Sequence, residues 1–236
     1  MTAPHDHVPL RDHWWPRPGW RPGRIALTWH LVFPHSTPLA RHVTAYQRAF
    51  DGLPGVDPVP AEWLHLTVQA IGWADEIPPA TVSAVVDAVR ARVSALALFD
   101  LVFDRPTIYG EAAAIRSDPD VPVARLRETV RAGLRDVLGD DGVPTAPEQA
   151  RGFLPHVTIA YSRVDADVAP YAAALAGVVR PPTTVPVTEA TLIRQERLLA
   201  PHWQYRWTVE AVAELGAPPS ASAGHRVDHL GQQLDL

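Results

Sequence analysis

Two spacings of hydrophobic residues alternate along the chain. Apolar residues in short runs or at every second position predict strands over residues 24–33, 63–72 and 153–162. Apolar residues three and four positions apart predict helices over residues 38–50, 78–96 and 123–139. The remaining predicted elements are two or more strands over 98–116, a helix over 167–178, and strands over 185–198 and 203–215. This mixture of strands and helices predicts an α+β fold.

Residue types at the helix ends support these assignments. Ser36 or Thr37 is placed to cap the helix over 38–50, and prolines stand at the start of the helix over 78–96. The helix over 123–139 ends at a glycine, which is typical of a helix end. The second of these helices has an apolar face made of Val82, Val85, Val86, Val89 and Val93.

The sequence divides into an arm, a body and a tail. Residues 1–23 are rich in Pro, His, Trp and Arg without a regular period, which predicts an irregular N-terminal arm. This arm either folds over a cleft as a lid or fastens the start of the chain to the body. We expect the body to span residues 24–215 and residues 216–236 to form a disordered tail.

Composition narrows the range of functions. The chain of 236 residues is long enough for one substantial domain. It contains no cysteine, which excludes disulfides, thiolate metal sites and cysteine nucleophiles, so catalysis would use histidine, carboxylates, hydroxyls or arginine. The formal net charge of −5 disfavours binding along an extended nucleic acid, whereas a mononucleotide or a short oligonucleotide remains compatible.

The sequence gives no sign of a membrane span or a secretory signal. No window approaches roughly eighteen consecutive apolar residues. The N-terminus also lacks the basic-then-apolar order of a signal peptide. We therefore expect a cytoplasmic protein with no membrane partner, and we expect it to be a monomer.

Two predicted strands carry the same short motif, a histidine followed two positions later by a threonine. His65 and Thr67 lie in WLHLTVQAIG, and His156 and Thr158 lie in FLPHVTIAYS, with the two histidines 91 positions apart. Side chains alternate between the two faces of a strand, so each histidine shares a face with its threonine, about 6 to 7 Å away. The apolar residues between them are expected to pack on the other face.

A third copy of the tripeptide shows why the strand setting matters. His42 and Thr44 fall in the predicted helix over 38–50, where residues two apart point about 200° away from each other around the axis. These two side chains cannot serve one site. A single histidine in an apolar strand is more often a packed residue than a catalytic one, but two strands with the same His-x-Thr offset favour catalysis.

Two histidines and two hydroxyls suit the cleavage of a phosphodiester. One imidazole can remove a proton from the attacking oxygen while the other donates a proton to the departing oxygen. The threonine hydroxyls can hold the phosphoryl oxygens while negative charge accumulates on them. This scheme needs no metal, and no cluster of histidines or carboxylates at metal-site spacing accompanies either motif, so we expect no cofactor.

The paired motifs resemble those of the two-histidine phosphoesterase superfamily, in particular its 2'-5' RNA ligase and cyclic phosphodiesterase (LigT-like) branch. The stretch RGFLPHVTIAYS is especially similar to that branch's second motif, in which a basic residue precedes Pro-His-x-Thr. The resemblance covers residues 24–215. It implies a bilobal, duplicated unit with two antiparallel sheets facing a central cleft and helices on the outer faces. It also implies that His156 acts as general base toward water and His65 as general acid toward the leaving ribose oxygen.

Four further residues are candidates for substrate binding. Arg151 lies five positions before His156, where its guanidinium could meet a phosphate, and a solvated loop arginine is the alternative. Tyr161 and Trp63 flank the motif strands and could stack on a base, although core packing is the commoner fate of such residues. His30 could line the cleft, and structural burial is its alternative.

These observations predict a metal-independent phosphodiesterase. Its substrates would be small nucleotides or RNA ends that carry a 2',3'-cyclic phosphate or a 2'-5' linkage. Ligation of RNA ends is possible at the same site, because the same acid and base serve both directions. One alternative is a binding module that holds a nucleotide or an RNA end without turning it over. Another is a structural or regulatory protein that acts through the arm and the tail.

Overall fold

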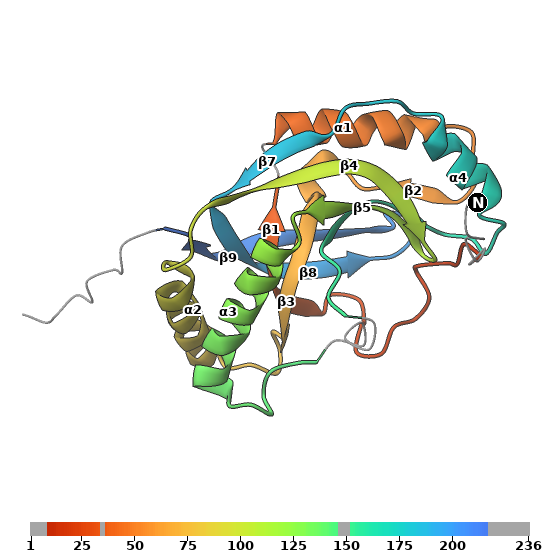
Figure 1. Ribbon diagram of the computed structural model, residues 1–236. Coiled ribbons are helices and arrows are strands. Elements are labelled where there is room, and N and C mark those ends of the chain that lie inside the picture. The colour runs from red at the N-terminus through yellow and green to blue at the C-terminus, as the bar shows by residue number, and fades with distance from the viewer. Residues whose placement is uncertain (1–8, 34–35, 146–151, 217–236) are drawn as a thin grey trace, which may run out of the picture.

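The computed structural model describes residues 9–33, 36–145 and 152–216 (Figure 1). Its strands are β1 (Ile25–Val32), β2 (Val56–Pro58), β3 (His65–Trp73), β4 (Phe99–Tyr109), β5 (Ala112–Asp118), β6 (His156–Ser162), β7 (Thr183–Val187), β8 (Glu189–Leu198) and β9 (Gln204–Glu214). Its helices are α1 (Thr37–Gln47), α2 (Pro79–Val93), α3 (Val121–Leu138) and α4 (Ala169–Ala176), with 3-10 turns at Arg48–Phe50 and Ala61–Trp63. Every predicted element is present, and the α+β class is confirmed. The short strand β2 was not predicted.

The strands form one sheet in the order β7-β4-β5-β6-β3-β1-β8-β9, and β2 pairs with β6 beside this path. Neighbouring strands run antiparallel throughout. In the middle of the sheet, β3 and β6 pair over a short length, with Leu66 opposite Val157. We call this pairing the join. The resemblance implied two sheets; the structure instead links two halves into one nine-stranded sheet through this pair of residues. One half is β7-β4-β5-β6 with β2, and the other is β3-β1-β8-β9.

One pair of helices packs on each half of the sheet. Helix α1 packs against β7 and α4 packs against β4, whereas α2 and α3 pack against each other and against β9 and β3 (Figure 1). The chain therefore crosses between the halves, because α1 follows β1 in sequence but packs on the half that contains β7 and β4. Each half is built from segments that are distant in the sequence.

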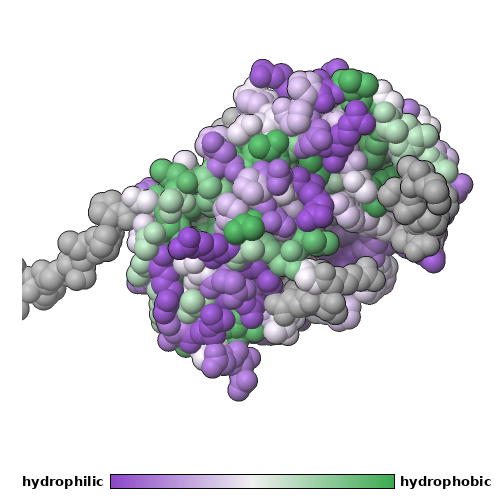
Figure 2. All heavy atoms as spheres, in the orientation of Figure 1, coloured by the Kyte–Doolittle hydropathy of each residue, from purple (hydrophilic) through white to green (hydrophobic). Residues whose placement is uncertain are grey.

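The apolar face of α2 is the surface that packs in the core. All five positions predicted for it are buried: Val82, Val85, Val86, Val89 and Val93. On α3, a Cβ atom added to Gly133 would lie 2.8 Å from a methyl carbon of Val89, so glycine permits the close approach of these two helices. Figure 2 shows mainly hydrophilic residues where α2 and α3 face the solvent.

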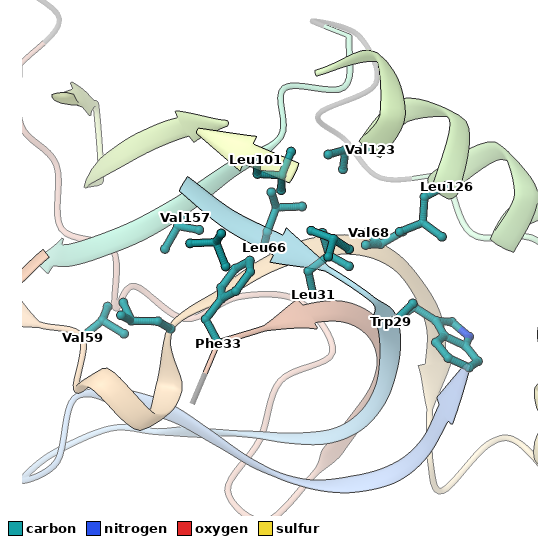
Figure 3. Packing of buried hydrophobic residues seen from close by; sticks show 14 of the residues in the cluster. Trp29, Leu31, Phe33, Val59, Leu66, Val68, Leu101, Val123, Leu126 and Val157 are labelled. Atoms are coloured by element: carbon teal, nitrogen blue, oxygen red, sulfur yellow. The ribbon is translucent and has the colours of Figure 1, made fainter. Parts of the chain in front are cut away.

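A hydrophobic core lies beneath the strands that carry the two motifs. Leu66 and Val157 are fully buried, and Leu31 and Phe33 are buried near them (Figure 3). Removing one such apolar side chain from water contributes about 1.5–3 kcal/mol to folding. Burial of both residues of the join therefore holds the motif strands in a fixed register.

The third His-x-Thr tripeptide has a structural role, in agreement with its helical spacing. In α1 the buried His42 ring is hydrogen-bonded through Nε2 to the carbonyl oxygen of Asp104 at 2.6 Å. The Thr44 hydroxyl donates to the carbonyl oxygen of Ala40 within the same helix at 2.8 Å. The two side chains have separate partners and form no joint site.

Two predicted helix ends are confirmed. Ser36 caps α1, because its hydroxyl accepts a hydrogen bond from the Leu39 N–H at 3.4 Å. Gly139 follows α3 with a φ of 74°, in the left-handed region that favours glycine. Local residue types therefore set where these helices begin and end.

The described part of the N-terminal arm, residues 9–23, packs against the body (Figure 1). Leu10 forms a backbone bridge with Ala166, and the side chains of Leu10 and Trp14 are both buried. The predicted tail lies outside the described residues apart from Gly216. Among the described helices, none has the length and apolar character needed to cross a membrane.

Candidate functional site

The two His-x-Thr motifs lie next to each other at the join between the halves of the sheet. Leu66 and Val157 pair across the strands and both point into the core. Residues on either side of each must then point to the opposite face, so both motifs occupy one face of the sheet. The antiparallel register also sets each histidine beside the threonine of the other motif. The structure thus brings together the four predicted residues His65, Thr67, His156 and Thr158.

Both motif histidines are held in the same orientation by the same kind of hydrogen bond. The Nδ1 atom of His65 lies 2.9 Å from the carbonyl oxygen of Trp63, and Nδ1 of His156 lies 2.7 Å from the carbonyl oxygen of Leu154. Because a carbonyl oxygen only accepts, each Nδ1 carries a proton and donates it. When either ring is neutral, its Nε2 atom therefore presents a lone pair.

The His65 ring is packed between aromatic rings. It stacks on His30 with centroids 4.5 Å apart and meets the Trp207 ring edge-on at 4.9 Å. Burial lowers the pKa of His65 to about 4; the bond to the Trp63 carbonyl opposes this shift, and the nearby charge of His156 adds to it. His65 is therefore neutral in the free protein near pH 7.

His30 lies behind the motif residues rather than on the exposed surface beside them. Its side chain is only 1% exposed, and its Nε2 atom lies 3.1 Å from the Thr67 hydroxyl oxygen. Its Nδ1 atom has no hydrogen-bond partner among the described residues. Burial, followed by the charge of His65, lowers the pKa of His30 well below its usual value, so this ring is neutral.

A bulge in β6 brings Tyr161 to the face that carries the second motif. Relative to β5, strand β6 contains one extra residue at Ile159, which reverses the alternation of side chains after it. Tyr161 therefore shares a face with Thr158, although the two residues are three positions apart. Burial raises the pKa of Tyr161, opposed in part by the Thr158 hydroxyl, and the phenol remains protonated.

A small aromatic pocket, with a cavity of about 10 Å³, lies beside His65. Its aromatic lining residues are Trp63, Tyr161, Trp203 and Tyr205. Trp63 and Tyr161 are predicted site residues, and the structure places them at this pocket. The other two were missed, together with Trp207, although the stretch WQYRWTV puts an aromatic residue at every second position of a predicted strand. That alternation was the signal that an aromatic face exists there.

The N-terminal arm packs behind the aromatic pocket. The His13 ring stacks on Tyr161 with centroids 4.1 Å apart, and its Nε2 atom lies 3.1 Å from the hydroxyl of Tyr205. Its Nδ1 atom lies 3.2 Å from Glu111, which also pairs with Arg17. Burial raises the pKa of Glu111, but bonds from His13 and other donors outweigh it and lower the pKa to about 2. The arm therefore supports the pocket wall from behind.

The remaining predicted site residue, Arg151, lies outside the described residues. Within the described part of the chain, no group of three or more His, Cys, Asp or Glu side chains is arranged to hold a metal ion. The protein groups that the described site offers are therefore the imidazoles, the hydroxyls and the aromatic rings.

Comparison with known proteins supports the relationship suggested by the motifs. The sequence matches the 2'-5' RNA ligase superfamily over residues 35–198. The fold is similar to that of TT0787 of Thermus thermophilus, with 22% identity and a TM-score of 0.60 over 81% of this chain and 98% of that chain. It is also similar to E. coli LigT in the apo form, with 19% identity and a TM-score of 0.55 over 82% of this chain and 99% of that chain.

No curated protein matches the chain. At the identities given above, the likeness to solved structures shows the fold alone. The sequence match extends over the greater part of the chain and includes both His-x-Thr strands. The resemblance drawn from the motifs is confirmed: the chain belongs to the 2'-5' RNA ligase superfamily.

Proposed function

We propose that the protein is a metal-independent phosphodiesterase that hydrolyses 2',3'-cyclic phosphates or 2'-5' linkages in small nucleotides or at RNA ends. The catalytic residues are His65 and His156, assisted by Thr67 and Thr158. The observation that carries this proposal is the matched pair of imidazoles. Each histidine donates its Nδ1 proton to a backbone carbonyl two residues earlier and leaves Nε2 for chemistry, on strands that meet at one residue pair.

The proposed hydrolysis needs one proton to be removed and one to be supplied. His156 accepts a proton from the attacking water, whose oxygen forms a bond to phosphorus. The bond from phosphorus to the leaving ribose oxygen breaks, and that oxygen takes a proton from Nε2 of His65. Thr67 and Thr158 donate hydrogen bonds to the non-bridging oxygens, where negative charge accumulates.

The low pKa of His65 sets a condition on this assignment. In the free protein His65 is neutral near pH 7, because burial lowers its pKa to about 4. A phosphate anion beside Nε2 favours the charged imidazolium and raises that pKa. His65 therefore takes up its proton when the substrate binds. If NMR shows that its pKa stays near the free value in a nucleotide complex, the acid and base roles are reversed.

The aromatic rings beside His65 are of the kind that binds a nucleotide base, and the cavity between them, about 10 Å³, must widen to admit one. Trp63 and Tyr161 lie beside His65 in that pocket, and aromatic rings bind unpaired bases by stacking. E. coli LigT, which has a similar fold, has been crystallised with 3'-AMP, NADP+, ATP and phosphate. We propose that Trp63 and Tyr161 contact the base and that Arg151 contacts a phosphate.

A turnover assay tests the proposed function. The substrates are nucleoside 2',3'-cyclic phosphates and 2'-5'-linked dinucleotides, incubated with the full chain in EDTA. The wild type should form product, and His65→Ala and His156→Ala should each lose about 10²- to 10⁴-fold in kcat. The matched control is His202→Ala, because His202 is exposed and lies outside the site; it should retain wild-type activity.

Three outcomes would contradict the proposal. Turnover that persists in both active-site variants would exclude the two histidines from the chemistry. Turnover that requires an added metal would contradict the metal-independent scheme. Calorimetric binding of these nucleotides without product would instead favour the binding module.

A further inference from the structure

His30 is a buried polar side chain to which the proposed reaction assigns no role. It lies on β1 opposite Thr67 of β3, and its ring stacks on His65. Its Nε2 atom is hydrogen-bonded to the Thr67 hydroxyl at 3.1 Å. A buried imidazole that contacts both residues of one motif can influence both of them without touching the substrate.

The direction of the hydrogen bond between His30 and Thr67 follows from the other ring nitrogen. A neutral imidazole carries one proton, on either Nδ1 or Nε2. Nδ1 of His30 is buried without a partner among the described residues, and a buried N–H without an acceptor is rarer than an unpaired acceptor. The proton therefore belongs on Nε2, from which it is donated to the Thr67 oxygen.

This direction decides what the Thr67 hydroxyl can do. A hydroxyl has one proton to donate and two lone pairs with which to accept. When His30 occupies a lone pair of Thr67, the hydroxyl proton of Thr67 is free to point toward the exposed face of β3. A phosphoryl oxygen on that face is an acceptor, so the bond from His30 leaves Thr67 in the form that binds it.

We propose that His30 is a positioning residue that fixes Thr67 as a hydrogen-bond donor to the substrate phosphate. This inference rests on the proposed function, because it assigns Thr67 to the phosphoryl oxygens. His30 acts through Thr67 and through its stack on His65, and its 1% exposure keeps it away from the substrate itself. Its neutral state is supported by burial, which lowers its pKa.

Two substitutions separate the hydrogen bond from the packing. His30→Phe keeps an aromatic ring stacked on His65 but removes the donor. His30→Gln places an amide N–H near the position of Nε2 and keeps the donor without the ring. A neutral hydrogen bond of about 1–1.5 kcal/mol corresponds to roughly tenfold in rate, so His30→Phe should lower kcat about tenfold with little change in KM. His30→Gln should recover most of this loss.

A double-mutant cycle with Thr67 shows whether His30 acts through that hydroxyl. In a Thr67→Ala background the donor has no acceptor, so adding His30→Phe should lower kcat no further. The inference is overturned if His30→Phe turns over substrate like the wild type, if His30→Gln is as slow as His30→Phe, or if the two losses multiply in the double variant. Thermal unfolding of each variant identifies any loss of rate that comes from unfolding.

A measurement on the unmodified protein needs neither a variant nor a substrate. Nitrogen-15 NMR of the histidine rings near pH 7 should show His30 with its proton on Nε2, and His65 and His156 with theirs on Nδ1. A proton on Nδ1 of His30 would overturn the inference. Because this result does not depend on turnover, it is distinguishable from a failure of the proposed function, which would appear as an inactive wild type.

Discussion

The two motif strands share one arrangement of their histidines but differ in what lies behind them. In both, Nδ1 donates to the carbonyl two residues earlier. Behind β3 stand the buried rings of His30 and Trp207, and His65 is half-buried. Behind the second motif stand Tyr161 and the N-terminal arm, and the histidine of that motif is exposed. The shared hydrogen bond gives both rings the orientation that a pair of proton-transferring histidines requires. The two rings differ in how far they are buried.

The half that contains β3 (the first half) and the half that contains β6 (the second half) differ in a way that bears on the proposed roles of their histidines. In the first half, His65 is a neutral imidazole of low pKa that packs against aromatic rings, and in the proposed reaction it takes up a proton beside the substrate anion. The second half leaves its imidazole open to water, the nucleophile of the proposed hydrolysis. The two motifs are therefore alike in the orientation of their histidines and unlike in how far those histidines are buried.

Substitution of either proposed catalytic histidine should lower kcat more than any other change. A substrate with a better leaving group distinguishes the roles of the two histidines. A nitrophenyl ester of a nucleotide needs little help from a general acid, because its leaving oxygen is weakly basic. With this substrate His65→Ala should regain most of its lost rate, whereas His156→Ala should stay slow by about 10²- to 10⁴-fold. Steady-state kinetics on both substrates measures this.

Equal recovery of both variants on the nitrophenyl ester would contradict the assigned roles. Recovery of His156→Ala alone would reverse them. The control is again His202→Ala, which should show the same ratio of rates on the two substrates as the wild type.

The arm contacts both halves, because the Trp14 ring meets Tyr161 of β6 and Tyr205 of β9. Trp14 is 4% exposed and donates through Nε1 to Asp57 at 2.9 Å. Trp14→Ala should lower the free energy of unfolding by about 3–5 kcal/mol, as expected for removing a buried aromatic side chain. Denaturant unfolding measures this loss, and hydrogen exchange should show faster opening of β6 and β9, whose tyrosines Trp14 contacts, than of β1.

The matched control for the arm is Val179→Ala, because Val179 is 84% exposed. Its effect on the free energy of unfolding should stay within about 0.5 kcal/mol. If Trp14→Ala is equally mild, or if it loosens β1 as much as β6 and β9, the arm does not selectively stabilise the strands that Trp14 contacts.

The threonines should contribute equally in both halves. Thr67→Ala and Thr158→Ala each remove one donor to the phosphoryl oxygens, and each should cost about 10²-fold in kcat. Thr44→Ala in α1 is the control, because that hydroxyl bonds within its own helix. A loss confined to one of the two site variants would show that a single threonine holds the phosphate.

Acidification should weaken the fold through the buried histidines of the first half. His65 has a folded pKa of about 4 and an unfolded value near 6.5, so between these values the unfolded state binds more protons. Stability is therefore lost as the pH falls from about 6.5 toward 4, by about 1.4 kcal/mol per pH unit for such a group. Denaturant unfolding at pH 7, 6 and 5 measures the slope.

His65→Gln should flatten this pH dependence, because it removes one group that titrates differently in the two states. His202→Ala should leave the slope unchanged. A wild-type slope of zero between pH 7 and 5 would show that burial does not lower the pKa of the buried histidines.

The sequence predicted the elements and the four motif residues because these depend on local patterns. The alternation of side chains along a strand predicted that His65 and His156 lie on one face and that Leu66 and Val157 pack on the other. Helical spacing predicted that His42 has no part in the site, and its bond within the core agrees. These inferences need only the periodicity of one strand or one helix. The structure agrees with each of them.

The features that were missed depend on contacts between distant segments. The bulge at Ile159 moves Tyr161 to the face of Thr158, and no single-strand pattern shows an extra residue. The packing of His13 on Tyr161 joins residues 148 positions apart, as their numbers show. Arg151 lies outside the described residues, so its predicted phosphate contact stays a prediction.

The central claim is that His65 and His156 present Nε2 to one phosphate, and an NMR titration with 3'-AMP tests it most directly. The ring resonances of both histidines should shift together along a single binding curve, with the pKa of His65 raised in the complex. The exposed His202 serves as the internal reference and should not move. Shifts confined to one of the two histidines, or two separate binding curves, would contradict the account.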